Sequence, residues 1–417
     1  MNTEAIVLSG ALALFLIASV SGRIERLYLT EPLVATAIGL VIGLFVLEDG
    51  IDLENPLILT FLELTLALVL FSDASRIDLT KLAEGYSWPL RMLAVGMPVA
   101  IFLGTALSAW YLTLPVGVAL LIGVILAPTD AALAEPVLAS EIVPQRVRQS
   151  LNVESGLNDG LAVPVLLIAI GIIESTSDGS AGTAVGLVLG QLGIGIVGGI
   201  VLGWIGAKSI GAGAAAGWMN PLHQKIAAVF LALGGFAAVQ LLGGSGFVAT
   251  FIAGGLMAHV IRPRGEYLYE FADSEGHAMV LIAFLLVGAG PVTTMVRDGG
   301  PSIEAMVIAL VSLLVLRPLA IAVSLAGQRL KLSTVSFLGW FGPRGLATIV
   351  FLLVAAEETD AIPAIVDEIV VTVVLASIVL HGLSAVPLSR RLARATSRMG
   401  ADMPEMGQAF PHPMRRL

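Results

Sequence analysis

The 417-residue sequence contains no cysteine, so disulfide bonds, thiol catalysis and thiolate metal sites are excluded. Charged residues are also scarce, at 13% of the chain, and aromatic residues make up only 6%. Hydrophobic residues reach 57%, whereas soluble domains contain about 45–50% of them and about 25% charged residues. A soluble fold of this length could not bury so much apolar surface. We therefore expect the chain to be embedded in lipid.

Long apolar segments divide the sequence into about thirteen candidate membrane spans. A helix of about 17–25 apolar residues can cross the hydrocarbon core, whereas the edge of an open sheet cannot face lipid. We therefore predict an all-α polytopic membrane protein. The expected spans are 5–21, 30–47, 56–76, 88–113, 115–139, 149–174, 182–208, 225–242, 246–261, 276–290, 303–325, 333–356 and 364–388.

The basic residues support this number of spans and also predict an orientation. If the N-terminus is outside, eighteen of the 22 lysines and arginines fall on the cytoplasmic side, where membrane proteins carry an excess of them. Only Arg297 falls in an outer loop. The cytoplasmic set is Arg23, Arg26, Arg76, Lys81, Arg146, Arg148, Lys208, Lys225, Arg262, Arg264, Arg329, Lys331, Arg390, Arg391, Arg394, Arg398, Arg415 and Arg416.

The sequence thus predicts a multi-pass protein of the cell membrane with a cytoplasmic C-terminus. The last residues, 393–417, lack apolar periodicity, and we expect them to form a short, disordered cytoplasmic tail.

Two of the expected spans contain helix-breaking residues near their midpoints. Pro128 lies in the fifth span, two residues before Asp130, and Pro343 lies in the twelfth, directly before Arg344. Proline removes a backbone donor, and the freed polar groups are tolerated at membrane depth only inside protein or beside water. The two spans are seven helices apart and run in opposite directions, a pattern typical of transporters with inverted-topology repeats. The alternative is two unrelated proline kinks.

The sixth span begins with a polar cluster. Glu154 and Asn158 are spaced i, i+4, as are Ser155 and Asp159, so their side chains share one helix face. A charge near the bilayer centre costs at least about 2.5 kcal/mol, which makes such carboxylates functional candidates. Arg317 in the eleventh span can pair with one of them, and we expect Glu154 to be its partner. Asp159 would then be left to titrate.

A cation could share the oxygens near this carboxylate. Hard cations such as Na⁺ prefer oxygen ligands, and the hydroxyls of Ser155 and Thr129 add to the carboxylate of Asp159. A buried Asp can be poised where protons and cations compete for the same oxygens.

These motifs resemble the cation:proton antiporter-1 family, the sodium/proton exchangers of the NhaP and NHE type. The resemblance covers nearly the whole chain and rests on Pro128-Thr129-Asp130, Glu154 with Asn158-Asp159, Arg317 and Gly342-Pro343-Arg344-Gly345. It implies that Asp159 carries the cation and the proton, with Thr129, Ser155 and Asn158 in the binding site. It also implies that Asp130 and Arg344 stabilise two crossed, discontinuous helices.

The resemblance also implies a domain organisation. Residues 1–392 would form the antiporter domain of a homodimer. The interface part would comprise roughly 1–86 and 209–290, and the mobile core roughly 87–175 and 303–392.

Two positions bear on details of the activity. Similar transporters often carry Phe-Glu-Gly-Gly where this chain has Phe71-Ser72-Asp73-Ala74, so the acid is displaced and shortened. Asp73 is therefore either a cytoplasmic gate or extra ligand, or an interfacial partner of Arg76. Electrogenic relatives place a second Asp where Asn158 stands, so we expect electroneutral 1:1 exchange here.

The sequence therefore predicts a secondary antiporter that exchanges Na⁺ for H⁺ around Asp159, with Li⁺ or K⁺ as alternative cations. A sodium-coupled symporter would need a pocket for an organic substrate, which the low aromatic content disfavours. An intramembrane enzyme is disfavoured because no His-Glu-x-x-His or Gly-x-Ser-x-Gly element is present. We expect no cofactor beyond the transported ions, and no nucleic-acid partner. Glu63 is an isolated acid in the third span, and the sequence leaves open whether it faces a partner helix or a cavity.

Overall fold

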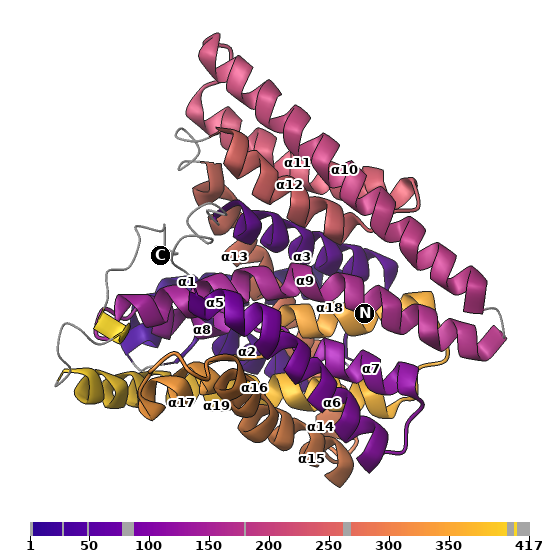
Figure 1. Ribbon diagram of the computed structural model, residues 1–417, viewed down its shortest axis with the longest axis vertical. Helices are drawn as coiled ribbons and strands as arrows, with labels where there is room; N and C mark the ends of the chain where they lie inside the picture. The colour runs from indigo at the N-terminus through magenta and orange to yellow at the C-terminus, as the bar shows by residue number, and fades with distance from the viewer. Residues whose placement is uncertain are drawn as a thin grey trace.

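The computed structural model describes residues 3–26, 29–47, 50–76, 87–178, 181–261, 268–397 and 404–406. In this part of the chain all regular structure is helical, as the sequence predicted, and no strand occurs (Figure 1). Six of the basic residues that supported the predicted orientation lie outside the described ranges. They are Lys81, Arg262, Arg264, Arg398, Arg415 and Arg416.

Helices occupy all thirteen predicted spans. In chain order they are α1 (Thr3–Arg26), α2 (Glu31–Phe45), α3 (Pro56–Arg76), α5–η1–α6 (Ser87–Arg91, Met92–Gly96, Met97–Tyr111), α7 and α8 (Val116–Ile125, Ala131–Leu138), α9 (Gln145–Asp178), α10 (Ala181–Ala215), α11 (Pro221–Leu241), α12 (Gly246–Ile261), α13–η3–α14 (Leu268–Val287, Gly288–Val292, Thr293–Arg297), α15–η4–α16 (Ile303–Val311, Ser312–Leu316, Arg317–Ser324), α17 and α18 (Leu332–Trp340, Leu346–Glu358) and α19 (Ile365–Thr396). Eight helical stretches of the described chain are long and apolar enough to cross a membrane, and four shorter apolar helices accompany them.

The predicted boundaries of the tenth span, 276–290, are too narrow. Helix continues from α13 through η3 into α14, and the stretch from Glu275 to Arg297 is apolar enough to span. Pro291 does not end this helix, because it lies in the π-helical turn η3, whose wider hydrogen-bonding pattern tolerates a missing donor.

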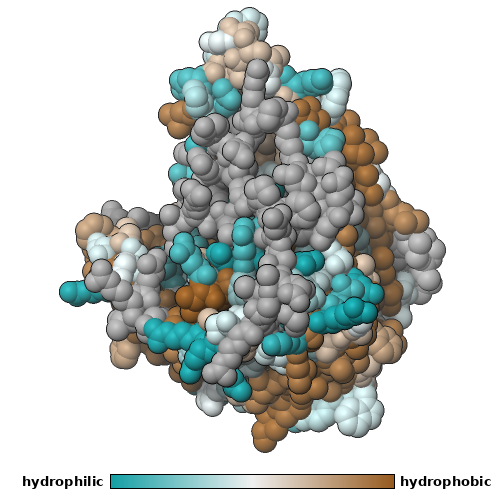
Figure 2. Space-filling model, turned by 60° about the vertical axis from the view of Figure 1, so that its left-hand side comes forward, coloured by the Kyte–Doolittle hydropathy of each residue, from teal (hydrophilic) through white to brown (hydrophobic). Residues whose placement is uncertain are grey.

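The helices lie side by side in one bundle (Figure 1). Helices α10, α11 and α12 form one flank, α3 and α9 lie near the centre, and α15, α16, α17 and α19 lie on the other flank. Large apolar side chains remain exposed on α10, as expected for a lipid-facing helix. Figure 2 brings the left-hand side of Figure 1 forward, where hydrophilic residues lie across the lower part of the face and apolar residues cover its right-hand side.

Two groups of helices repeat the same order of features. In each, a π-helical turn precedes a helix with proline at its second position, Pro98 in α6 and Pro318 in α16. An interrupted helix follows, α7–α8 in one group and α17–α18 in the other, and then a long helix with an internal proline, Pro164 or Pro387. The interrupted helices run in opposite directions in Figure 1.

The expectation that residues 393–417 are disordered is wrong for 393–396, which belong to α19, and for 404–406, which form a short 3-10 helix, η5 (Pro404–Met406). The buried carboxylate of Glu405 accepts hydrogen bonds from the Lys331 amide (2.9 Å) and the Thr334 hydroxyl (3.1 Å), and Arg146 donates to the Pro404 carbonyl (2.8 Å). Glu405 thus caps α17, whose own N-cap residue makes no side-chain cap bond.

Candidate ion-binding site

The two interrupted helices meet at their breaks. Residues 126–130 separate α7 from α8, and residues 341–345 separate α17 from α18. The Asp130 amide donates a hydrogen bond to the Pro343 carbonyl, at 2.8 Å, so each break supplies a partner for a backbone group freed in the other.

The Asp130 carboxylate joins the N-terminal ends of two half-helices. Its Oδ1 accepts from the amides of Ala132 (2.8 Å) and Leu133 (3.3 Å) in α8, and its Oδ2 accepts from the Leu346 amide (2.9 Å) in α18. A negative charge is favourable at both positive helix ends. Gly345 makes this approach possible, because a Cβ there would lie 2.0 Å from Oδ2.

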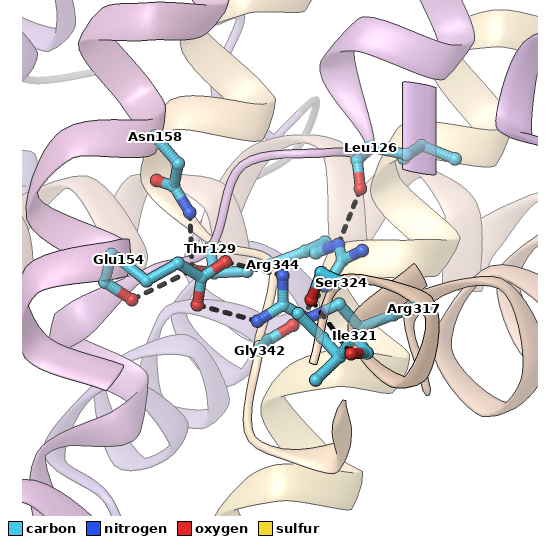
Figure 3. Close-up of polar contacts among 10 residues, drawn as sticks. Leu126, Thr129, Glu154, Asn158, Arg317, Ile321, Ser324, Gly342 and Arg344 are labelled. Carbon is cyan, nitrogen blue, oxygen red and sulfur yellow. Dashed lines mark hydrogen bonds and ion pairs between the residues drawn. The ribbon is translucent and has the colours of Figure 1, made fainter. Parts of the chain in front are cut away.

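Arg344 compensates the partial negative charge at the C-terminal ends of the other two half-helices. Its guanidinium is fully buried, and Nε donates to the Leu126 carbonyl at 2.7 Å, at the C-terminal end of α7 (Figure 3). Nη1 donates to the Gly342 carbonyl in its own break. A positive charge is favourable beside these exposed carbonyls.

A second hydrogen-bond network ties the α17–α18 break to α19. The Arg344 amide donates to Ser377 Oγ at 2.7 Å, and this hydroxyl lies 3.1 Å from His381 Nδ1. His381 Nε2 lies 2.8 Å from the Trp340 carbonyl, and Nδ1 also lies 2.9 Å from the Ser377 carbonyl, so the ring links α19 to the end of α17. The sequence did not identify this network. Its only signal was the i, i+4 spacing of Ser377 and His381 within an apolar helix.

Arg317 and Glu154 form a buried, bidentate ion pair. Arg317 Nη1 lies 2.5 Å from Glu154 Oε1 and Nη2 lies 2.7 Å from Oε2, and the two side chains are 2% and 1% exposed (Figure 3). Arg317 follows the π-helical turn η4 directly. A Cβ at Gly342 would lie 2.4 Å from Arg317 Nε, so only glycine lets the guanidinium pass the break.

The polar side chains of α9 meet the α7–α8 break at Thr129. Thr129 Oγ1 lies 2.9 Å from Ser155 Oγ and accepts a hydrogen bond of 2.7 Å from Asn158 Nδ2. Asn158 Oδ1 is buried and has no donor among the described residues. Asp159 follows on the same helix and is 7% exposed. Hydroxyl and amide groups therefore gather where the chain is unwound, and Asp159 lies one helical turn from Ser155 on the same face of α9.

Asp73 also reaches this cluster, from α3. A Cβ at Gly156 would lie 3.4 Å from Asp73 Cβ and 3.7 Å from its Cγ, so the acid lies against the backbone of α9 beside Ser155. Both Asp73 and Arg76 are buried, at 7% and 4% exposure. Gly156 was missed by the sequence reasoning, because nothing in the local pattern shows that another helix approaches there.

Crossed, interrupted helices with buried carboxylates at the crossing are typical of multi-pass membrane transporters built from inverted repeats. Residues 11–391 match the family described as "sodium/hydrogen exchanger, transmembrane", and the chain belongs to this family of transporters. The family predicted from the motifs is thus confirmed, and the protein is not an enzyme.

Individual relatives agree with this assignment. The chain is 26% identical over 366 residues to the K(+)/H(+) antiporter NhaP of Alkalimonas amylolytica, covering 85% of this chain and 61% of that protein. It is 27% identical over 392 residues to the Na(+)/H(+) antiporter ApNhaP of Aphanothece halophytica, covering 91% and 72%. The structure of the sodium proton antiporter MjNhaP1 from Methanocaldococcus jannaschii superposes with a TM-score of 0.74 at 22% identity, over 94% of this chain and 99% of that one, and shows the same fold. The chain therefore spans about three fifths of the length of the first of these relatives.

Proposed function

We propose that the protein is a secondary antiporter that exchanges Na⁺ for H⁺ by alternating access around Asp159. The observation that carries the proposal is the group of oxygens from Thr129, Ser155 and Asn158 beside this carboxylate, at the unwound segment between α7 and α8. Na⁺ sites in such transporters are formed by freed backbone carbonyls together with side-chain oxygens near the bilayer midplane. The buried Asn158 Oδ1 offers one more acceptor for a cation.

Four charged side chains near the site are engaged in contacts that hold the crossing together. Glu154 is paired with Arg317, Asp130 accepts from the amides of two half-helices, and Arg344 donates to carbonyls at both breaks. We assign the exchange of ions to Asp159, one helical turn from Ser155 on the same face of α9. A proton and a cation would compete for its oxygens, so each would be released when the other binds.

This competition favours antiport over symport, since a sodium-coupled symporter needs two solutes bound together. A single exchanging carboxylate, with Asn158 as its neighbour, carries one proton or one monovalent cation, so the exchange is electroneutral at 1:1. The second candidate is K⁺/H⁺ exchange at the same site, which is supported by the name of the Alkalimonas relative. Li⁺ is a further candidate cation.

For the motion, we propose the division into two parts that the resemblance implies. Residues 1–86 and 209–290 would form the interface part of a homodimer, and residues 87–175 and 303–392 the mobile core. The N-terminus would lie outside the cell membrane and the C-terminus in the cytoplasm, in keeping with the excess of lysine and arginine on the predicted cytoplasmic side.

Proteoliposomes that contain a pH-sensitive dye test the proposal. With a proton gradient imposed, Na⁺, Li⁺ and K⁺ are added in turn, and we expect the unmodified protein to dissipate the gradient with at least one of them without an electrical current. Asp159→Asn should reduce the rate to that of empty liposomes, because its side chain cannot exchange a proton.

The matched control is Asp298→Asn, at an exposed turn between α14 and α15, which should keep the full rate. Substantial exchange by folded Asp159→Asn protein would remove the central assignment. A sustained current would contradict the 1:1 stoichiometry alone.

A further inference from the structure

Glu63 is a carboxylate inside the helix bundle that has no part in the proposed exchange site. It lies on α3 and is only 8% exposed. No described residue donates it a hydrogen bond or forms an ion pair with it. Burying a charged carboxylate without a counter-charge costs roughly several kcal/mol of free energy. Binding of a proton or a cation to the carboxylate removes this cost.

Among the described residues, the charges identified as acting on Glu63 are acidic. Glu357 and Glu358, the last two residues of α18, lie close enough to repel it, and Glu174 on α9 lies close to Glu358. Glu357 and Glu358 are exposed at the end of α18, whereas Glu63 is buried. The only basic residue of the predicted outer loops, Arg297, donates instead to carbonyls at the end of α2.

The position of Glu63 along α3 separates it from the exchange site. Glu63 and Asp73 are ten residues apart, which is about 15 Å along a helix. Leu66, Ala67 and Leu70 lie between them and are at most 1% exposed. A packed apolar layer therefore separates Glu63 from the Asp73 and Asp159 region, and Glu63 lies on the side where α18 ends.

Glu63 also lies where the two proposed parts of the molecule meet. Helix α3 belongs to the interface part, whereas α9 and α18 belong to the core, and α3 packs against both (Figure 1). Movement of the core would change the distance between Glu63 and the carboxylates of α18.

We propose that Glu63, together with Glu357 and Glu358, forms a second binding station for protons and monovalent cations, where α3 packs against α18 and on the proposed outer side of the membrane. The inference rests on the proposed antiport for its role in transport. In this role the station takes a proton or passes a monovalent cation. It raises the concentration of the exchanged ions at the outer side before the apolar layer opens.

Transport measured separately from each side tests the station. Right-side-out and everted membrane vesicles report the apparent KM for the cation on the outer and inner sides. We expect Glu63→Gln to raise the outer KM about tenfold, in line with the steering effect of local charge, with the inner KM and the maximal rate unchanged. Glu304→Gln is the matched control, because Glu304 is an exposed acid in the first turn of α15 at the same end of the bundle, and it should change neither KM.

An equal change of the apparent KM on both sides, or no change on either side, would overturn the proposal.

A second measurement does not depend on transport. A hydrophobic carbodiimide reacts with protonated carboxyl groups in apolar surroundings, and mass spectrometry should find it on Glu63, with labelling reduced by the transported cation and by Glu357→Gln/Glu358→Gln. Protection of Glu63 without any exchange activity would leave the station intact and refute the antiport. Labelling that neither the cation nor the double substitution alters would refute the station.

Discussion

At the scale of single residues, charges at the crossing are compensated in three different ways. Asp130 accepts hydrogen bonds from backbone amides, Arg344 donates to backbone carbonyls, and Glu154 is paired with Arg317. The first two arrangements use the ends of half-helices, which carry partial charges of opposite sign. Only the third requires contact between two charged side chains from different helices.

The Glu154–Arg317 pair leads to a stability prediction. Arg317→Ala should lower the free energy of unfolding by about 3–5 kcal/mol, because it leaves a buried carboxylate without its counter-charge. Glu154→Gln should also destabilise the protein, and both variants should lose stability before they lose ion selectivity. Thermal unfolding in detergent, followed by a fluorescence-detected size-exclusion signal, measures the change.

The double variant Glu154→Gln/Arg317→Ala serves as the control, since neither side chain is then charged. It should be more stable than Arg317→Ala alone, as expected for two coupled positions. If the stability lost in the double variant equals the sum of the losses in the two single variants, the two side chains do not interact as a pair.

At the scale of the helices, the crossing depends on glycine in the break between α17 and α18. Gly345→Ala should disrupt it, because the added Cβ would lie 2.0 Å from Asp130 Oδ2 and displace the carboxylate from the N-terminal ends of α8 and α18. We expect transport to fall to background and the midpoint of thermal unfolding to drop. Gly234→Ala in α11 is the matched control, because a Cβ there meets nothing within 4 Å, and it should behave like the unmodified protein. Full activity of Gly345→Ala would show that Asp130 need not contact α18.

At the scale of the whole molecule, the proposed alternating access requires the proposed core to move against the proposed interface part. Helix α9, assigned to the core, packs on α12, assigned to the interface part, where a Cβ at Gly160 would lie within 2.3 Å of the Phe251 ring. Because the chain has no cysteine, Gly160→Cys/Phe251→Cys introduces the only thiol pair. With the ring removed, we expect the two Cβ atoms to come within disulfide range, about 3.5–4.5 Å.

Oxidation of this double variant should stop exchange, and a reductant should restore the rate of the reduced protein, both measured with the dye assay. The single variants Gly160→Cys and Phe251→Cys provide the references and should not respond to oxidant. A cross-linked protein that transports at the rate of its reduced form would show that α9 does not move relative to α12.

The ionisable residues of the site could be recognised from the sequence, because a charge inside an apolar segment stands out without any knowledge of its neighbours. Asp130, Glu154, Asp159, Arg317 and Arg344 all belong to this class. Their partners were harder to predict. Ser377, His381 and Gly156 are ordinary residues of apolar helices, and their contacts depend on which other helix approaches them.

The sequence by itself determined the helical class, the positions of the thirteen apolar segments, the two interruptions and the family. Each of these follows from hydropathy, proline chemistry or motifs read along the chain. The tertiary structure decided that the Pro343 carbonyl meets the Asp130 amide, that Asp73 lies beside Gly156, and that residues 404–406 cap α17. These contacts join segments far apart in the chain, so they depend on how the helices cross and pack, which no local pattern contains.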